Sequence, residues 1–162
     1  MGDPYPEPAS DLSQYYGSPP PAVLKVGQAE QVAALGATCW FQENQAGVPV
    51  ESCQDSPGIP TPQTFLPVDL QFSGTLHLNL PIDPDGVSVF HMPVSPADLL
   101  QPPADGLILW PYREGQITYL SNQVEQEFQL ELSPGLNVVY IDARWEGLGS
   151  AGYGFLVEAR TP

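Results

Sequence analysis

Basic side chains are scarce in this sequence. Lys25, Arg113, Arg144 and Arg160 are the only four, against 19 aspartates and glutamates. Because proteins bind nucleic acid mainly by neutralising backbone phosphates, a formal charge of −15 argues against nucleic acid as a partner. The same acidity favours solubility and leaves cations or basic partners as ligands.

Long apolar runs are also missing, since no stretch approaches the ~18 residues that a membrane-spanning helix needs. The start, Met1-Gly2-Asp3-Pro4, has neither the basic nor the apolar region of a signal peptide. We interpret it as a chain from which a signal or lipidation segment has been removed. Contact with a membrane is therefore expected only through that removed lipid anchor, and no transmembrane segment is predicted.

No long stretch has the 3.6-residue period of a helix, and the apolar positions instead follow a period of two. Alternation runs through 66–72, 76–80 and 124–132. Further strands are expected over 87–94, 107–112, 116–120, 137–145 and 153–160. About eight to ten short strands with one wet and one buried face predict an all-β sandwich, immunoglobulin-like or jelly-roll-like.

The segments between these runs carry turn residues. Asp83-Pro84-Asp85-Gly86 and Ser133-Pro134-Gly135 are typical of tight turns between strands. Ser95-Pro96-Ala97-Asp98 predicts one short helical turn, with Ser95 as its N-cap, Pro96 as its first residue and Asp98 as the acidic residue at N3.

Residues 1–21 differ in composition from the rest. They hold six of the 20 prolines, which remove backbone donors and favour extended geometry. This predicts a linker or stalk over 1–21 before a single domain over 22–162. Part of this segment, which carries Tyr5, Tyr15 and Tyr16, is able to dock on that domain.

Cys39 and Cys53 are the only cysteines, and a polar segment separates them. A structural zinc site needs four ligands at short spacing, and the histidines, His77 and His91, lie far away in sequence. A catalytic cysteine needs an electropositive setting that this acidic chain lacks. The pair therefore predicts a disulfide worth ~3 kcal/mol and, with the Pro-rich segment, a location outside the cytoplasm.

The residues Gly36-Ala37-Thr38-Cys39-Trp40, followed by Cys53-Gln54-Asp55, form a G-x-x-C-W…C-x-D pattern. It resembles small secreted or lipid-anchored bacterial proteins that have no assigned activity. Ala151-Gly152-Tyr153-Gly154-Phe155 is similar to their closing strand. The resemblance implies an envelope location and a β fold, and it supplies no catalytic residue.

Residues with catalytic or metal-binding chemistry are few. The sequence has no G-x-S-x-G nucleophile elbow, and Gly147-Leu148-Gly149-Ser150 has these residue types in the wrong order. No catalytic residue is therefore predicted. Asp83–Gly86 is similar to the start of an EF-hand calcium loop. Such a loop needs a glutamate at its twelfth position, and the twelfth residue counted from Asp83 is Val94. We predict no cofactor and assign no metal ligand. A calcium site built from loop acids stays open.

The aromatic residues give a binding hypothesis. Trp110-Pro111-Tyr112 places two aromatic rings beside a proline that would interrupt a central strand. Trp110 and Tyr112 are therefore predicted to stack on a ligand from an edge or loop. Trp145, in phase with Val139 and Ile141, is expected in the core, and Trp40 is expected to shield the disulfide.

The leading functional hypothesis is a non-catalytic binding or structural module of the bacterial envelope, with a protein or envelope glycan as partner. One alternative is a carbohydrate-binding module that uses Trp110 and Tyr112. Another is a secreted hydrolase without a local motif. The expected location is extracellular, periplasmic or on the cell surface.

Overall fold

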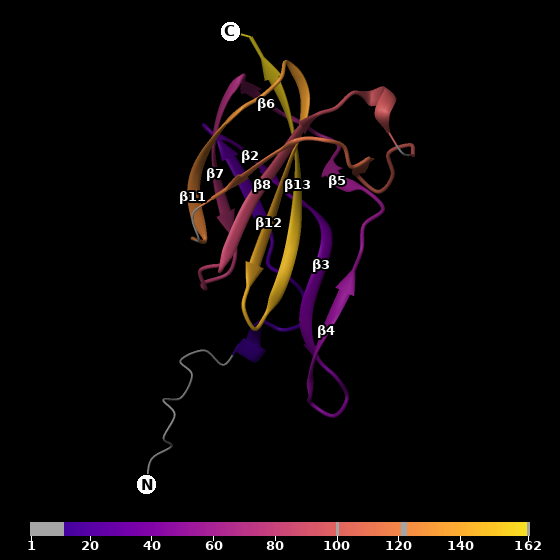
Figure 1. The fold of residues 1–162 in the computed structure, drawn as a ribbon, viewed down its shortest axis with the longest axis vertical. Coiled ribbons are helices and arrows are strands. Elements are labelled where there is room, and N and C mark those ends of the chain that lie inside the picture. The colour runs from indigo at the N-terminus through magenta and orange to yellow at the C-terminus, as the bar shows by residue number, and fades with distance from the viewer. Residues whose placement is uncertain (1–11, 100, 121–122, 162) are drawn as a thin grey trace.

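The computed structural model describes residues 12–99, 101–120 and 123–161, and over these ranges the fold is all-β, as the alternation predicted (Figure 1). Two short 3-10 helices accompany the strands, η1 (Leu12–Tyr15) and η2 (Pro96–Asp98). The strands are β1 (Ala22–Val26), β2 (Ala29–Val32), β3 (Ala34–Glu43), β4 (Pro49–Gln54), β5 (Ile59–Pro62), β6 (Leu66–Asp69), β7 (Gln71–Leu78), β8 (Gly86–Pro93), β9 (Leu107–Trp110), β10 (Gln116–Tyr119), β11 (Glu125–Glu131), β12 (Gly135–Trp145) and β13 (Gly149–Arg160). No helix in these ranges has the length and apolarity needed to cross a bilayer.

Two sheets form the sandwich. Sheet A has the order β11-β7-β1-β2, and sheet B has the order β10-β8-β12-β13-β3-β4. The pairs in these two orders are antiparallel, and β6 joins sheet B by pairing in parallel with the last part of β13. In Figure 1 β11 and β7 lie to the left of β8, β12 and β13, and the β3–β4 hairpin projects at the lower right.

The main core lies between the two sheets. Alternate residues of β12, such as Val139, Ile141 and Trp145, are buried against apolar side chains of sheet A such as Phe72. Trp145 packs edge-on against Trp40 with ring centroids 5.6 Å apart. The predicted core position of Trp145 is confirmed, and Trp40 likewise points into the core.

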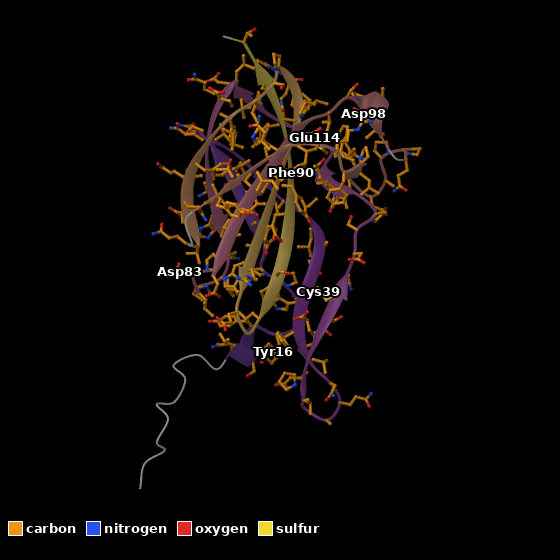
Figure 2. The ribbon with its side chains drawn as sticks, in the orientation of Figure 1. Tyr16, Cys39, Asp83, Phe90, Asp98 and Glu114 are labelled. Atoms are coloured by element: carbon orange, nitrogen blue, oxygen red, sulfur yellow. A yellow bond between two sulfur atoms is a disulfide. The ribbon has the colours of Figure 1, made fainter. Side chains whose placement is uncertain are left out.

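Residues 12–21 lie against the body of the domain. The indole Nε1 of Trp40 donates to the carbonyl of Tyr15 at 2.9 Å. The hydroxyl of Tyr153 donates to the carbonyl of Pro20 at 2.7 Å. Tyr16 stacks at a tilt on Phe41, and its position at the lower end of the sandwich is labelled in Figure 2. The second half of the expected linker is thus docked, and residues 1–11 lie outside the described residues.

A small third sheet, formed by β5 and β9, covers part of the outer face of sheet B. Ile59 and Trp110 pack there on Val138 and Leu156. Gly154 allows this close approach, because an added Cβ would lie 1.8 Å from the carbonyl oxygen of Pro60. Sheet B is therefore buried on both faces at this end.

The strands between residues 66 and 80 differ from the expected ones. The apolar alternation runs unbroken through 66–72, but the chain leaves sheet B after Asp69 and enters sheet A at Gln71. Of the segment expected at 76–80, residues 76–78 form the end of β7 and residues 79–80 lie beyond the strand. Period-two alternation reports which face is buried, and it does not report which sheet a residue joins.

A short helical turn follows β8. Ser95 caps η2 by accepting from the backbone N–H of Ala97, and Asp98 accepts in return from the N–H of Ser95. The helical turn predicted from Ser95-Pro96-Ala97-Asp98 is confirmed, with Ser95 as its N-cap, and the two hydrogen bonds together form a capping box.

The polar segment between the cysteines is a hairpin and not an open loop. β3 and β4 pair over six positions, with Cys39 directly opposite Cys53. The side-chain oxygen of Asn44 accepts from the N–H groups of Ala46 and Val48, at 2.9 and 3.0 Å, and this closes the turn.

Candidate functional site

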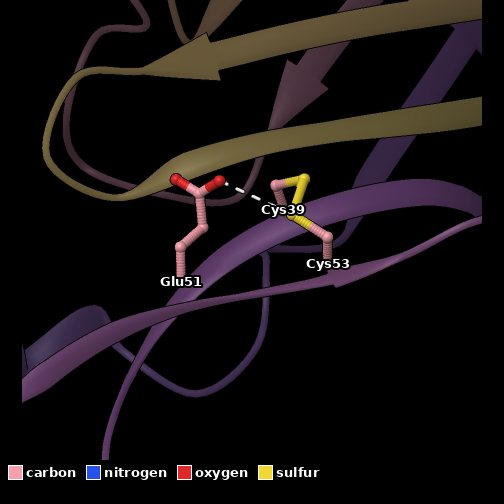
Figure 3. The surroundings of a disulfide bond; sticks show 3 residues. All are labelled: Cys39, Glu51 and Cys53. Carbon is pink, nitrogen blue, oxygen red and sulfur yellow. Dashed lines mark hydrogen bonds between the residues drawn. A yellow bond between two sulfur atoms is a disulfide. The ribbon is translucent and has the colours of Figure 1, made fainter.

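The disulfide joins Cys39 of β3 to Cys53 of β4 across a Cα–Cα distance of 4.0 Å (Figure 3). This confirms the predicted bridge. Trp40 does not shield it, because successive residues of a strand point to opposite faces and Trp40 faces the core. A carboxylate oxygen of Glu51 lies 3.5 Å from the Sγ of Cys53.

Cys39, Glu51 and Cys53 are the one group of three potential metal ligands that the described residues bring together. Their sulfurs are bonded to each other and carry no thiolate, which is the form that binds metal. With the bridge intact, only the Glu51 carboxylate remains as a ligand there. The acids of the Asp83–Gly86 turn are also engaged, since Asp83 accepts from the N–H of Val124 and Asp85 from that of Glu146.

Trp110 and Tyr112 do not form a shared stacking surface. Trp110 is 1% exposed, and its Nε1 donates to the hydroxyl of Thr61 at 2.9 Å. This corrects the expectation for Trp110, because the third sheet covers the ring that was expected to stack on a ligand. Tyr112 is exposed beside it.

A cavity of about 360 Å³ opens at one edge of the sandwich, and we call it the edge cavity. It lies where β8 and β10 of sheet B approach the end of β11 of sheet A. Glu114, labelled in Figure 2, lies on the segment leading into β10. The polar residues that line it are His91, Glu114, Gln116, Glu131, Ser133 and Asn137.

Asn137, one of the residues that line the edge cavity, holds a buried polar atom without a partner. The residue has no exposed surface, and its Nδ2 donates to the carbonyls of Ser133 and Gly135 at 2.8 and 3.0 Å. Because both partners are acceptors, the amide cannot be flipped, and Oδ1 is left without a donor. A buried acceptor without a partner costs about 1–3 kcal/mol. It is the only such side-chain atom in the described part of the chain.

His91 lies beside Asn137 on the inner face of sheet B. Its backbone pairs with Gln116 on one side and Val139 on the other, and its side chain is 6% exposed. Burial lowers the pKa of His91 from its ordinary value of 6.5, so the imidazole is neutral at pH 7. Among the described residues none is hydrogen-bonded to this ring.

The lowered pKa of His91 predicts a loss of stability in acid. Below pH 6.5 the unfolded chain takes up a proton that the folded imidazole does not, so the free energy of unfolding falls as the pH falls. Urea unfolding of the wild type and of His91→Gln, from neutral to mildly acidic pH, measures this effect. We expect the variant to have the shallower pH dependence below pH 6.5. Identical slopes would contradict the burial of a neutral imidazole.

A second hollow, of about 500 Å³, lies beside the disulfide between Glu51, Arg144 and Glu146. The buried side chain in its wall, Trp145, donates to the carbonyl of Ile82 and is satisfied. No described residue lining this hollow holds a buried polar side-chain atom without a partner. The edge cavity is therefore the stronger candidate for a ligand site.

The sequence analysis did not single out Asn137, although a signal was present. Asn137 is in phase with Val139 and Ile141, so a polar residue occupies a position that the alternation assigns to the core. His91 is in phase with Val87 and Val89 in the same way. Polar residues at buried phases of neighbouring strands would have indicated the site.

The resemblance carried by the cysteine pattern stays a prediction. Comparison of the chain with protein-family models, with curated proteins and with solved structures finds no match.

Proposed function

We propose that this protein is a non-catalytic binding module of the bacterial envelope that holds a small polar ligand in the edge cavity. The observation that carries the proposal is the edge cavity itself, whose lining includes two buried polar residues, His91 and Asn137. A concave site with a few polar groups in its wall is the usual form of a small-molecule site.

The arrangement of the other side chains supports binding over catalysis. Ser133 and His91 line the same cavity, as a hydrolase would require. Nucleophilic catalysis needs the base within hydrogen-bond reach of the nucleophile, and within the described ranges no such bond joins Ser133 to His91. A panel of generic ester and peptide substrates is expected to show no turnover above background.

The disulfide supports the proposed compartment. Bridges of this kind form and persist in secreted and periplasmic proteins and are rare in the cytosol. The acidic surface and Pro-rich N-terminal segment fit a domain displayed away from a membrane.

A ligand screen by NMR tests the proposal. The probes are glucose, glucosamine, glycine, glutarate, cadaverine and a neutral diol of the same length as cadaverine. At least one is expected to shift the signals of the His91 ring and the Asn137 side-chain amide selectively. It should also raise the melting midpoint, because a ligand that binds only the folded state stabilises it.

Two matched variants locate the binding. Ser133→Tyr places a ring at the exposed rim of the cavity while keeping the backbone carbonyl that Asn137 uses. It is expected to abolish the shifts. Ser18→Tyr adds the same ring at an exposed position between η1 and β1, far from the cavity, and should leave them unchanged. Binding that survives Ser133→Tyr, or silence across all probes, would refute the site.

A further inference from the structure

We propose that the free edge of β10 is a homodimer interface, where β10 of two copies of the chain pairs antiparallel and joins the two copies of sheet B into one sheet. The inference does not depend on a ligand in the edge cavity. It rests on the backbone groups of β10, on the composition of this strand and on the symmetry of its short sequence.

The outer edge of β10 presents unpaired backbone groups. Within the described ranges β10 pairs with β8 alone. The N–H of Leu120 donates to the carbonyl of Val87 on β8 at 2.9 Å. Because bonded and non-bonded positions alternate along an antiparallel pair, the N–H and C=O groups of Ile117 and Tyr119 point away from β8. Such a row of free groups is a template for another strand.

Both faces of β10 are open to solvent. All four of its residues are exposed, with Ile117 at 64% and Tyr119 at 83%. Thr118 lies opposite Val89, which is buried in the main core, and yet Thr118 is itself exposed. Sheet A therefore does not extend beneath β10, and a second strand has room beside it.

The composition of β10 separates it from the other edges of the two sandwich sheets. Natural proteins protect exposed edges from pairing with charges and prolines. In the described ranges every other edge strand of these sheets holds an acidic residue, and two also hold a proline. These residues are Glu30 in β2, Pro49 and Glu51 in β4, Pro67 and Asp69 in β6, and Glu125, Glu127 and Glu131 in β11. β10, Gln116-Ile117-Thr118-Tyr119, holds neither.

The third sheet has an uncharged edge as well. β9 carries no charge or proline, but of its four residues only Leu107 is exposed. β10 is thus the edge that combines an uncharged sequence with full exposure.

The central residues of β10 are complementary to themselves. A two-fold axis at Thr118 places the Ile117 side chain of each copy opposite the Tyr119 side chain of the other, and Thr118 opposite its own copy. Aromatic with β-branched residues and threonine with threonine are favourable cross-strand pairs. Ile117 and Tyr119 are also the residues whose backbone groups point outward, so this register pairs all of these groups.

Charge favours this edge over the others for a second copy. Each chain carries a formal charge of −15, so two copies repel each other. Pairing through an uncharged strand adds no contact between like charges to that repulsion. Because the contact is small compared with the interfaces of permanent dimers, we expect a weak and reversible dimer.

Sedimentation equilibrium of the intact chain, up to about 1 mM, tests the proposal. We expect a monomer–dimer equilibrium that added salt strengthens, because salt screens the repulsion between the acidic chains. By NMR, the amide protons of Ile117 and Tyr119 should gain protection from exchange as the concentration rises. The amide of Leu120, already bonded to β8, should change little.

A pair of opposite charges at the two-fold axis tests the register. Thr118→Glu and Thr118→Lys each place like charges opposite one another, so each protein alone is expected to dimerise about tenfold more weakly than the wild type, or less. When the two are mixed, opposite charges face each other. The mixture should then associate at least as tightly as the wild type, which also shows that both variants fold.

Val32 provides the matched control. It is 58% exposed on β2, at the edge of sheet A, so Val32→Glu and Val32→Lys add the same charges away from the interface. Mixing these two proteins should give no gain over the average of the separate proteins. A chain that stays monomeric throughout, an association that salt weakens, or Thr118 variants that behave like the Val32 variants would each overturn the proposal.

Discussion

Replacing Trp110 by alanine is expected to lower the free energy of unfolding by about 3–5 kcal/mol, the usual cost of removing a large buried aromatic side chain. Trp110 is 1% exposed and packs between the third sheet and the outer face of sheet B. The substitution also removes the hydrogen bond from Nε1 to the hydroxyl of Thr61. Urea unfolding followed by far-ultraviolet circular dichroism gives the difference.

An exposed aromatic residue provides the control for this measurement. Tyr119 is 83% exposed on β10, and Tyr119→Ala is expected to change stability by less than about 1 kcal/mol. A small loss for Trp110→Ala, similar to that of Tyr119→Ala, would mean that Trp110 is a surface residue. The stacking hypothesis for Trp110 and Tyr112 would then be restored.

The burial of Trp110 was not predictable from the residues around it. Pro111 follows the tryptophan directly and breaks the strand, which is typical of an edge or loop. The strand that covers it, β5, reads Ile59-Pro60-Thr61-Pro62, and two prolines in four residues argue against a strand. The continuous apolar run in β13 was the available signal, since burial of both faces removes the alternation.

The two sheets were easier to predict than the ligand site. Alternation in β11 and β12 follows from one buried and one wet face, and it is local in sequence. The edge cavity instead depends on three separate stretches of chain: β8, residues 114–116 at the start of β10, and residues 131–137 from the end of β11 into β12. Their proximity is set by strand order, which no local pattern encodes.

For the cysteines, the bond was predictable from the sequence and the strands that carry it were not. The composition alone indicated a bridge, because no other ligand set competes for the sulfurs. The strands that carry the bridge were missed, since every residue of β4 except Ser52 is exposed and the strand has no apolar alternation. An edge strand that is wet on both faces leaves no period-two pattern.

Replacing both cysteines by alanine is expected to lower the free energy of unfolding by about 3 kcal/mol. The bridge closes a short loop, with Cys39 and Cys53 separated by 14 residues in sequence, so it restricts the unfolded chain. The loss of stability is also expected to differ between strands. Because β4 is the last strand of sheet B, hydrogen exchange should accelerate there much more than in the central strand β12.

Chemical reduction of the wild type serves as the matched control for the double variant. Reduced wild type and Cys39→Ala/Cys53→Ala should unfold at nearly the same urea concentration, since both lack the same covalent link. Tryptophan fluorescence should change little before global unfolding, because Trp40 and Trp145 pack in the core on the face opposite the bridge. A loss below about 1 kcal/mol would mean that pairing with β3 already holds the hairpin without the bridge.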